Sequence, residues 1–177
     1  MSDAPAPFRF AEALPLLERT PRLVDALLRG LPDGWLAADE GPETWSPPVV
    51  VGHLIHGERT DWMPRVRHLL EHGESLPFTP FDRFAQLRAA PRPIGDALDE
   101  FAALRRENLA ALAALQLTET DLDRRGRHPA LATVTLGQLL ATWVVHDLDH
   151  LVQIERTLAK RWRVAVGPWA AYLRVVQ

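Results

Sequence analysis

The sequence contains no cysteine, and this absence removes several kinds of chemistry from consideration. Disulfide bonds, thiolate metal sites and a cysteine nucleophile are excluded, so the ligands of any metal must be histidine, aspartate or glutamate. The N-terminal residues MSDAPAPFRF lack the basic start and the apolar run of a secretory signal. No apolar stretch approaches the roughly 20 residues that cross a bilayer. We therefore expect a cytoplasmic protein with no membrane partner.

Neither sign of charge is in marked excess. The formal net charge is −3 and the basic residues are scattered, so the chain lacks the basic stripe that nucleic-acid binding requires. Hydrophobic residues at 47% and charged residues at 24% are typical of a globular domain. We expect residues 1–177 to form one domain with its own core, acting on a small molecule rather than on nucleic acid.

The first helical pattern occupies residues 8–30, after a short arm rich in proline and alanine. Pro15 should interrupt this pattern, and Thr20-Pro21 has the cap-then-proline arrangement with which helices begin. Gly30 is a typical helix end. We therefore predict that a helix starts at Thr20 and runs to Gly30.

A second helical pattern runs from Ser46-Pro47 to Gly73. Pro64 lies inside it and should kink it, because proline removes one backbone hydrogen bond. Residues 73–93 follow, with several prolines and phenylalanines. Long connections of this kind are often functional, for instance as lids. We interpret this one as a plain surface loop, with a lid as the less favoured alternative.

Two further helices are predicted, at residues 94–117 and 135–161. Thr135 and Gln138 form a T-x-x-Q capping box at the start of the last one. Between the two helices, residues 118–121 indicate a turn or short helix, and residues 125–134 look irregular or weakly extended. A short helix is expected after Gly167. We see no convincing pair of strands, so the predicted fold class is all-α, a four-helix bundle with extra short helices.

Two histidines stand out in the last predicted helix. His146 and His150 are four residues apart and therefore lie on the same helical face. The rest of that face is apolar: Leu136, Leu139, Leu140, Trp143, Ile154 and Leu158. Buried imidazoles need hydrogen bonds or a metal, and one ion would serve both. Two interpretations stay open, a pair of core histidines satisfied by polar neighbours and a pair of metal ligands.

A third ligand from another helix would complete the set of three that is typical of catalytic zinc. His53 is the best candidate because it is the other histidine in an apolar run, and Glu58 and Asp61 come next. Three imidazoles suit zinc first, with nickel, iron, cobalt or manganese as alternatives. The remaining histidines have simpler explanations, on the surface or in a turn: His56, His68, His72 and His128.

Several stretches together resemble the DinB/YfiT-like superfamily of metal-binding four-helix bundles. The stretches are ERTPRLVDALLRGLP, TWSPPVVVGHLIHGERTDW, LGQLLATWVVHDLDHLVQIER and VGPWAAYL, and they are spread from Glu18 to Leu173, so that the resemblance spans nearly the whole chain. The resemblance implies a bundle of the up-down-down-up type. It also implies a metal bound by one histidine of the second helix and an H-x3-H pair of the fourth. By motif position these are His53, His146 and His150.

The resemblance further implies two kinds of activity. Some relatives are transferases or isomerases that use a low-molecular-weight thiol, namely bacillithiol, mycothiol or glutathione, with a metal that activates the thiol. Others are described as metal-dependent hydrolases or as DNA-damage-inducible proteins, which suggests a stress response. By the same analogy we expect a homodimer.

Asp149 and Glu58 are the candidate acid–base groups, and Asp147 is a further one. Each also has a plainer explanation, facing solvent or capping a helix. Asp149 sits beside a predicted ligand and is placed to orient another histidine, as outer-shell carboxylates often do. Trp143 is interpreted as core, or as a wall of the site. The competing hypothesis is a non-enzymatic bundle that binds a metal or small ligand for a structural or stress-response role, and a fourth protein ligand would favour it.

Overall fold

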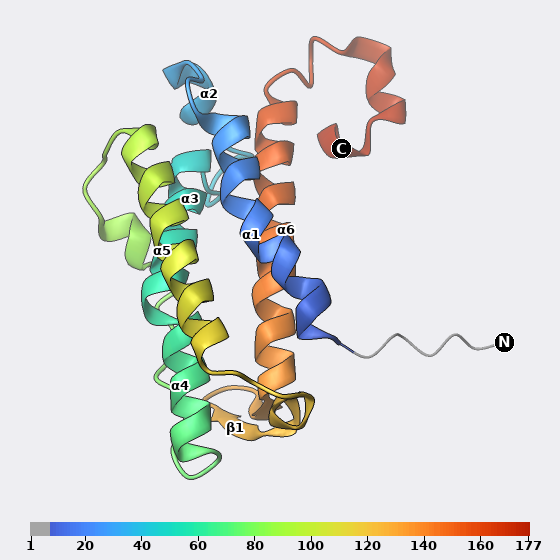
Figure 1. Ribbon diagram of the computed structural model, residues 1–177. Helices are drawn as coiled ribbons and strands as arrows, with labels where there is room; N and C mark the ends of the chain where they lie inside the picture. The colour runs from blue at the N-terminus through green and yellow to red at the C-terminus, as the bar shows by residue number, and fades with distance from the viewer. Residues whose placement is uncertain (1–7) are drawn as a thin grey trace, which may run out of the picture.

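The computed structural model describes residues 8–177, so the arm expected before Phe8 lies outside the described part. Four long helical segments run side by side as a bundle (Figure 1). They are α1 (Phe10–Leu28), α3 with α4 (Pro47–Thr60 and Trp62–His72), α5 (Ile94–Ala114) and α6 (Leu136–Lys160). In Figure 1, α1 and α6 run upward, whereas α3, α4 and α5 run downward. The predicted all-α bundle of the up-down-down-up type is confirmed.

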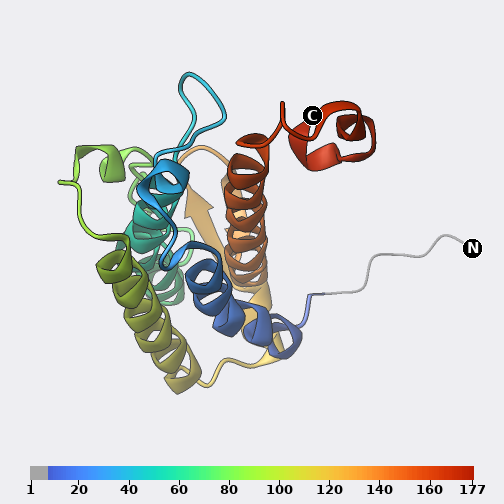
Figure 2. The same ribbon diagram turned by 90° about the horizontal axis from the view of Figure 1, so that it is seen from above.

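Two long connections allow this topology. The connection between α4 and α5 must return along the bundle because these two helices run in the same direction, and the connection between α5 and α6 crosses one end of the bundle. Viewed from above, the bundle has α1 and α3 each in contact with both α5 and α6 (Figure 2). The smaller elements are α2 (Asp33–Leu36), η1 (Ala85–Arg88), η2 (Glu119–Asp123), β1 (Arg125–His128), β2 (Ala132–Thr135), η3 (Gly167–Tyr172) and η4 (Arg174–Val176).

Two prolines lie inside α1, which continues through both, so the interruption predicted at Pro15 and the helix start predicted at Thr20-Pro21 are wrong. Pro21 has no N–H to donate to the carbonyl oxygen of Leu17, four residues earlier. That oxygen instead accepts a hydrogen bond from Arg105 Nη1 of α5, at 2.9 Å. A donor from a distant helix thus replaces the hydrogen bond that the proline removes.

The kink predicted from Pro64 is confirmed as a break between α3 and α4. The break falls at Asp61, whose φ of −112° and ψ of −67° depart from regular helix. It lies three residues before Pro64 because the proline ring crowds the carbonyl group of Thr60, four residues earlier. The break turns the chain so that α3 and α4 both follow α6.

A short antiparallel hairpin, β1 with β2, closes the lower end of the bundle, so the prediction of no strand pair is wrong. Its turn is held by His128, whose Nδ1 accepts hydrogen bonds from two backbone N–H groups of the turn, both at 3.1 Å. The interpretation of His128 as a turn residue is therefore confirmed. Gly126 allows the hairpin to lie against α4, since a Cβ there would be 2.9 Å from the Leu69 side chain.

A layer of polar side chains separates two hydrophobic clusters inside the bundle. In α6 the first cluster ends at Val144 and the second begins at Leu151, with His146, Asp147 and His150 between them. The capping box predicted at Thr135 and Gln138 is present and fixes where this helix begins. Among the described residues, no helix is both long and apolar enough to cross a bilayer. The polar layer is where the candidate site lies.

Candidate metal centre

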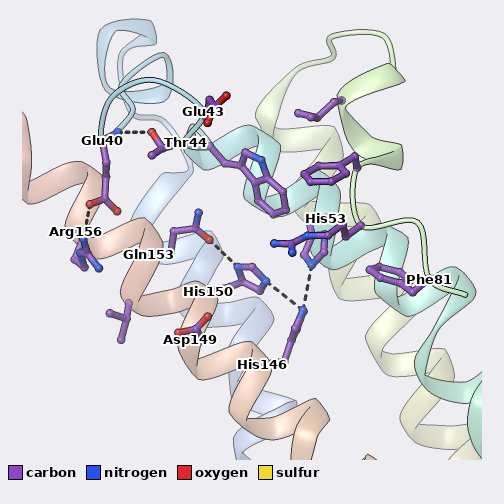
Figure 3. Close-up of a pocket in the computed structure, with 15 residues that line it drawn as sticks. Glu40, Glu43, Thr44, His53, Phe81, His146, Asp149, His150, Gln153 and Arg156 are labelled. Atoms are coloured by element: carbon purple, nitrogen blue, oxygen red, sulfur yellow. Dashed lines mark hydrogen bonds and ion pairs between the residues drawn. The ribbon is translucent and has the colours of Figure 1, made fainter. Parts of the chain in front are cut away.

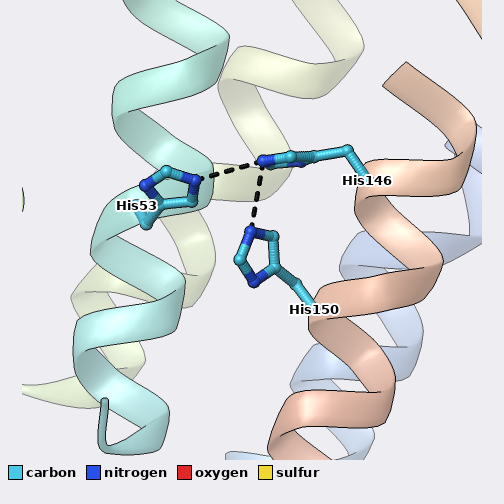
Figure 4. Close-up of side chains that lie close together, drawn as sticks. All are labelled: His53, His146 and His150. Atoms are coloured by element: carbon cyan, nitrogen blue, oxygen red, sulfur yellow. Dashed lines mark hydrogen bonds between the residues drawn. The ribbon is translucent and has the colours of Figure 1, made fainter. Parts of the chain in front are cut away.

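Three histidines converge in the polar layer, from α3 and α6 (Figure 4). The Nε2 atom of His146 lies 3.1 Å from Nε2 of His53 and 3.1 Å from Nε2 of His150. His53 and His150 are buried and His146 is half-buried. We call His53, His146 and His150 the three-histidine cluster. The structure therefore brings together the three residues that the sequence singled out.

The donor set of this cluster fits a divalent metal ion. A zinc–nitrogen bond of about 2.0–2.1 Å places two imidazole nitrogens roughly 3.3 Å apart at a tetrahedral angle. The separations of His146 Nε2 from the other two Nε2 atoms are close to this value, and all three ligand atoms lie within 4.8 Å of one another. In a neutral imidazole, each ring nitrogen is either a hydrogen-bond donor or an acceptor. Three such nitrogens that face one another therefore cannot all be paired among themselves. A cation accepts all three lone pairs at once. Within residues 8–177, no carboxylate joins the cluster as a fourth ligand.

The imidazoles of the cluster are held in the neutral form that binds metals. Burial, and after it the neighbouring imidazoles, lower the pKa of His53 to about 4 and the pKa of His146 to about 3. Burial also lowers the pKa of His150, where Gln153 and Asp149 oppose it. The ordinary histidine pKa is about 6.5, so all three lone pairs are available at neutral pH.

We expect the metal-free protein to lose stability as the pH falls from about 6.5 toward 4. Imidazoles of the unfolded chain bind protons near their ordinary pKa, whereas His53 and His146 bind them only near their lowered values. Because the folded-state pKa is the lower one, the stability present above pH 6.5 disappears on acidification. Urea unfolding in the presence of EDTA measures this slope. The double variant His53→Gln/His146→Gln should flatten it, and an unchanged slope would contradict the expectation.

Neighbouring side chains hold the rings of the cluster in place. Trp62 lies against His146 with ring centroids 5.1 Å apart, and Trp143 stacks on Trp62 at 5.6 Å and an interplanar angle of 9°. Gln153 Oε1 lies 2.8 Å from Nδ1 of His150, which fits a hydrogen bond from Nδ1–H. Trp143, interpreted as core or as a wall, is fully buried and acts on the cluster only through Trp62.

A pocket of about 1110 Å³ opens beside the cluster (Figure 3). Its inner wall is aromatic: the Trp45 ring lies 4.9 Å from His53 and the Phe81 ring 5.6 Å from His53, between centroids. Charged side chains from three segments also line the pocket, namely Glu40, Glu43, Arg83, Asp149 and Arg156. Phe81 belongs to residues 73–93, so the segment interpreted as a plain surface loop covers one side of the site.

In the same polar layer, Arg105 of α5 lies between two carboxylates, one of which, Asp147, directly follows His146 in α6. Its guanidinium group donates to Glu58 of α3 at 2.7 and 3.0 Å and to Asp147 of α6 at 2.5 and 3.0 Å. Glu58 also accepts from Trp143 Nε1 at 3.1 Å and from Asn108 Nδ2 at 2.9 Å. We call Arg105, Glu58 and Asp147 the Arg105 cluster. All three are buried, so the expectation that Glu58 and Asp147 face solvent is wrong.

The structure separates the two candidate acid–base groups. Asp149 is exposed and lines the pocket, beside His150 (Figure 3). Glu58 does not line it, since both of its oxygens accept hydrogen bonds in the Arg105 cluster. Asp61, an alternative third ligand, pairs with Arg65 at 2.7 Å. His56 lies outside the three-histidine cluster and stacks on Phe81. The catalytic roles of Asp149 and Glu58 stay predictions.

Sequence reasoning missed Arg105, although the sequence contained a signal for it. Arg105 follows Leu98 and Phe101 at helical spacing on the buried face of α5. A lone arginine on such a face needs buried anionic partners, and this requirement points to carboxylates on facing helices. The aromatic wall of the pocket was also missed, because Trp45 and Phe81 lie in connecting segments without a periodic pattern.

Comparisons with known proteins agree with this geometry. A family model described as the DinB superfamily matches residues 16–154, a span that includes the whole three-histidine cluster. Among solved structures the chain is similar to YfiT from Bacillus subtilis, described as a probable metal-dependent hydrolase with an unusual four-helix bundle topology. The TM-score is 0.75 at 21% identity, over 91% of each chain, which establishes the fold. A search of curated proteins finds no significant match. Because the family model spans most of the sequence, the chain belongs to the DinB superfamily.

Proposed function

We propose that the protein is a metal-dependent enzyme, with a divalent ion, zinc in first place, held by His53, His146 and His150. The observation that carries this proposal is the convergence of three neutral imidazoles beside an open pocket. Three protein ligands leave coordination positions for a nucleophile or substrate, whereas structural zinc sites usually have four. The description of the similar protein YfiT as a probable metal-dependent hydrolase also supports a metal-dependent enzyme.

When bound, the metal supplies Lewis acidity and lowers the pKa of a water or thiol beside it. The residues of the chain do the rest. The indole of Trp45 and the ring of Phe81 limit the access of water to the cluster from the pocket side. Asp149 is the exposed carboxylate nearest the ligands in sequence and is placed to take up a proton at the pocket. Arg83 lines the pocket, with its guanidinium group over the Phe84 ring, and offers a charge to a polar substrate group.

The nucleophile defines two versions of the enzyme, hydrolysis with water and transfer with a low-molecular-weight thiol such as bacillithiol, mycothiol or glutathione. The absence of cysteine from the sequence means that a thiol nucleophile must come from a cosubstrate. A pocket of about 1110 Å³ has room for a small thiol and an electrophile together. We therefore propose thiol transfer and hydrolysis as the two reactions to be tested.

Elemental analysis of protein purified without a nickel column tests the metal, and two assays test the reaction. We expect about one divalent ion per chain. The loaded protein is then incubated with glutathione or bacillithiol and monochlorobimane, and in parallel with activated esters. Metal-dependent conjugation supports the transferase, and metal-dependent ester cleavage supports the hydrolase.

Two results would count against this proposal. Wild-type protein that carries no metal and binds none on titration would contradict the whole site. Protein that binds metal but turns over neither class of substrate would favour the non-enzymatic bundle. A homodimer and a cytoplasmic location stay predictions that these experiments do not address.

A further inference from the structure

Within residues 8–177, four buried side-chain atoms at or near the metal centre lack a hydrogen-bond partner, and three of them belong to His53 and Gln86. They are Nδ1 of His53 and both atoms of the Gln86 carboxamide, Oε1 and Nε2, whereas the fourth is Nδ1 of His146. Buried polar groups in native proteins are nearly always satisfied. The coincidence of a free ring nitrogen and a free carboxamide therefore calls for an explanation.

Gln86 is held against the helix that carries His53. It lies in η1, within the connection from α4 to α5, and η1 packs on α3. Its Cβ is 3.2 Å from the position that a Cβ of Gly52 would occupy, so a side chain at residue 52 would push Gln86 away by a few tenths of an ångström. Gly52 directly precedes His53 in the helix. The carboxamide is thereby held near the His53 ring. The backbone of Arg83, on the same connection, and to a smaller extent the Gln86 carboxamide oppose the lowering of the His53 pKa by burial.

The other ligand with a carboxamide neighbour shows what such a contact does. Gln153 Oε1 lies 2.8 Å from Nδ1 of His150, which places the proton of that imidazole on Nδ1 and leaves the lone pair on Nε2. Nε2 is the atom that faces the three-histidine cluster. The tautomer of a ligand histidine is commonly fixed in this way, by the partner of its second nitrogen.

We propose that Gln86 is a positioning residue for His53. Its carboxamide oxygen accepts a hydrogen bond from Nδ1–H of His53 and so directs the Nε2 lone pair toward the metal, as Gln153 does for His150. The terminal torsion of a glutamine is broad, so its carboxamide oxygen can turn toward a neighbouring donor. The Arg83 carbonyl group, also beside His53, lies on the same connection. This proposal rests on the metal site proposed above.

The consequence is that residues 73–93 contribute to metal binding as well as to the wall of the pocket. The connection supplies Phe81 to the wall and Gln86 to the ligand His53. A change in its position therefore alters the metal centre and the substrate pocket together. Such a change acts through the contact of Gln86 with His53, so the helices that carry the histidines can stay in place.

Zinc titration in competition with a chromophoric chelator tests the proposal, with the full chain. Gln86→Leu should weaken zinc binding by about 10- to 100-fold, as loss of an outer-shell partner does. Gln86→Glu keeps an acceptor oxygen and should bind zinc about as the wild type does. Arg88→Ala is the matched control. Its side chain pairs with Asp82 and braces the same connection without reaching His53, so its zinc affinity should stay unchanged.

A second measurement does not depend on zinc. In the metal-free protein, ¹⁵N NMR of the imidazoles should show His53 with its proton on Nδ1, and Gln86→Leu should shift it toward the Nε2–H tautomer. Wild-type affinity in Gln86→Leu, an equal loss in Arg88→Ala, or an Nε2–H tautomer of His53 in the wild type would overturn the proposal. A wild type that binds no zinc contradicts the metal site instead, and the tautomer measurement then still decides the role of Gln86.

Discussion

Replacing Arg105 by methionine should lower the free energy of unfolding by about 3–5 kcal/mol, the usual cost of breaking a buried ion pair. The substitution leaves Glu58 and Asp147 buried without their cation. It also deprives the Leu17 carbonyl oxygen of the donor that replaces the one lost at Pro21. Urea unfolding at neutral pH, followed by far-UV circular dichroism, measures the loss.

The pH dependence of this variant separates lost charge pairing from lost packing. Burial raises the pKa of Glu58, while Arg105 lowers it, so removal of Arg105 raises it further. A raised folded-state pKa gives stability that is present at low pH and lost as the pH rises. The loss in the free energy of unfolding caused by Arg105→Met should therefore shrink on acidification toward about pH 4.5.

The triple variant Arg105→Met/Glu58→Gln/Asp147→Asn should recover part of the lost free energy of unfolding at pH 7. A deficit that is independent of pH and unrelieved in the triple variant would assign the effect to packing.

Replacing His146 by alanine should weaken metal binding by roughly a hundredfold or more. Four-ligand zinc sites bind with about 10–16 kcal/mol, so one ligand contributes roughly 3–4 kcal/mol. His146 is the most sensitive of the three positions because its Nε2 lies 3.1 Å from both other ring nitrogens. Its loss leaves His53 and His150 as an incomplete pair. Zinc titration and elemental analysis of the purified variant measure the effect.

The control for this prediction is His56→Ala, one helical turn after His53 on the same helix. His56 lies outside the three-histidine cluster, so its removal should leave the metal content unchanged. Circular dichroism of His146→Ala then gives a second result. An intact fold without metal agrees with a catalytic site, whereas loss of the fold together with the metal indicates a structural one. His146→Ala that retains wild-type affinity would show that the cluster is not the metal site.

Local sequence patterns predicted most of the helices and two members of the three-histidine cluster. The capping box at Thr135 and Gln138 fixed the start of α6, and the four-residue spacing placed His146 and His150 on one face. Both signals depend on residues within one or two helical turns. His53 was a weaker inference from periodicity, since it lies off the centre of its apolar stripe. Its place in the cluster depends on how α3 packs on α6, and the family resemblance supplied that information.

The errors share a physical cause, namely contacts between residues far apart in the sequence. The helix start predicted at Thr20-Pro21 failed because Arg105, 88 residues from Leu17, satisfies the carbonyl group that the proline leaves free. The hairpin was missed because its strands have four residues each and its turn is held by His128 rather than by an Asn-Gly pair. The contribution of residues 73–93 to the pocket wall was missed because an aromatic residue in an irregular segment gives no periodic signal.

The Arg105 cluster also bears on how the bundle folds. Its hydrogen bonds join residues separated by 42, 47 and 88 positions, and they connect all four long segments through one guanidinium group. Such contacts form only after long loops have closed. In a partly assembled bundle, the Arg105 guanidinium group would be removed from water before its carboxylate partners are in place, which costs free energy. Intermediates that lack one helix are thereby disfavoured, and the transition between folded and unfolded chain becomes more nearly all-or-none.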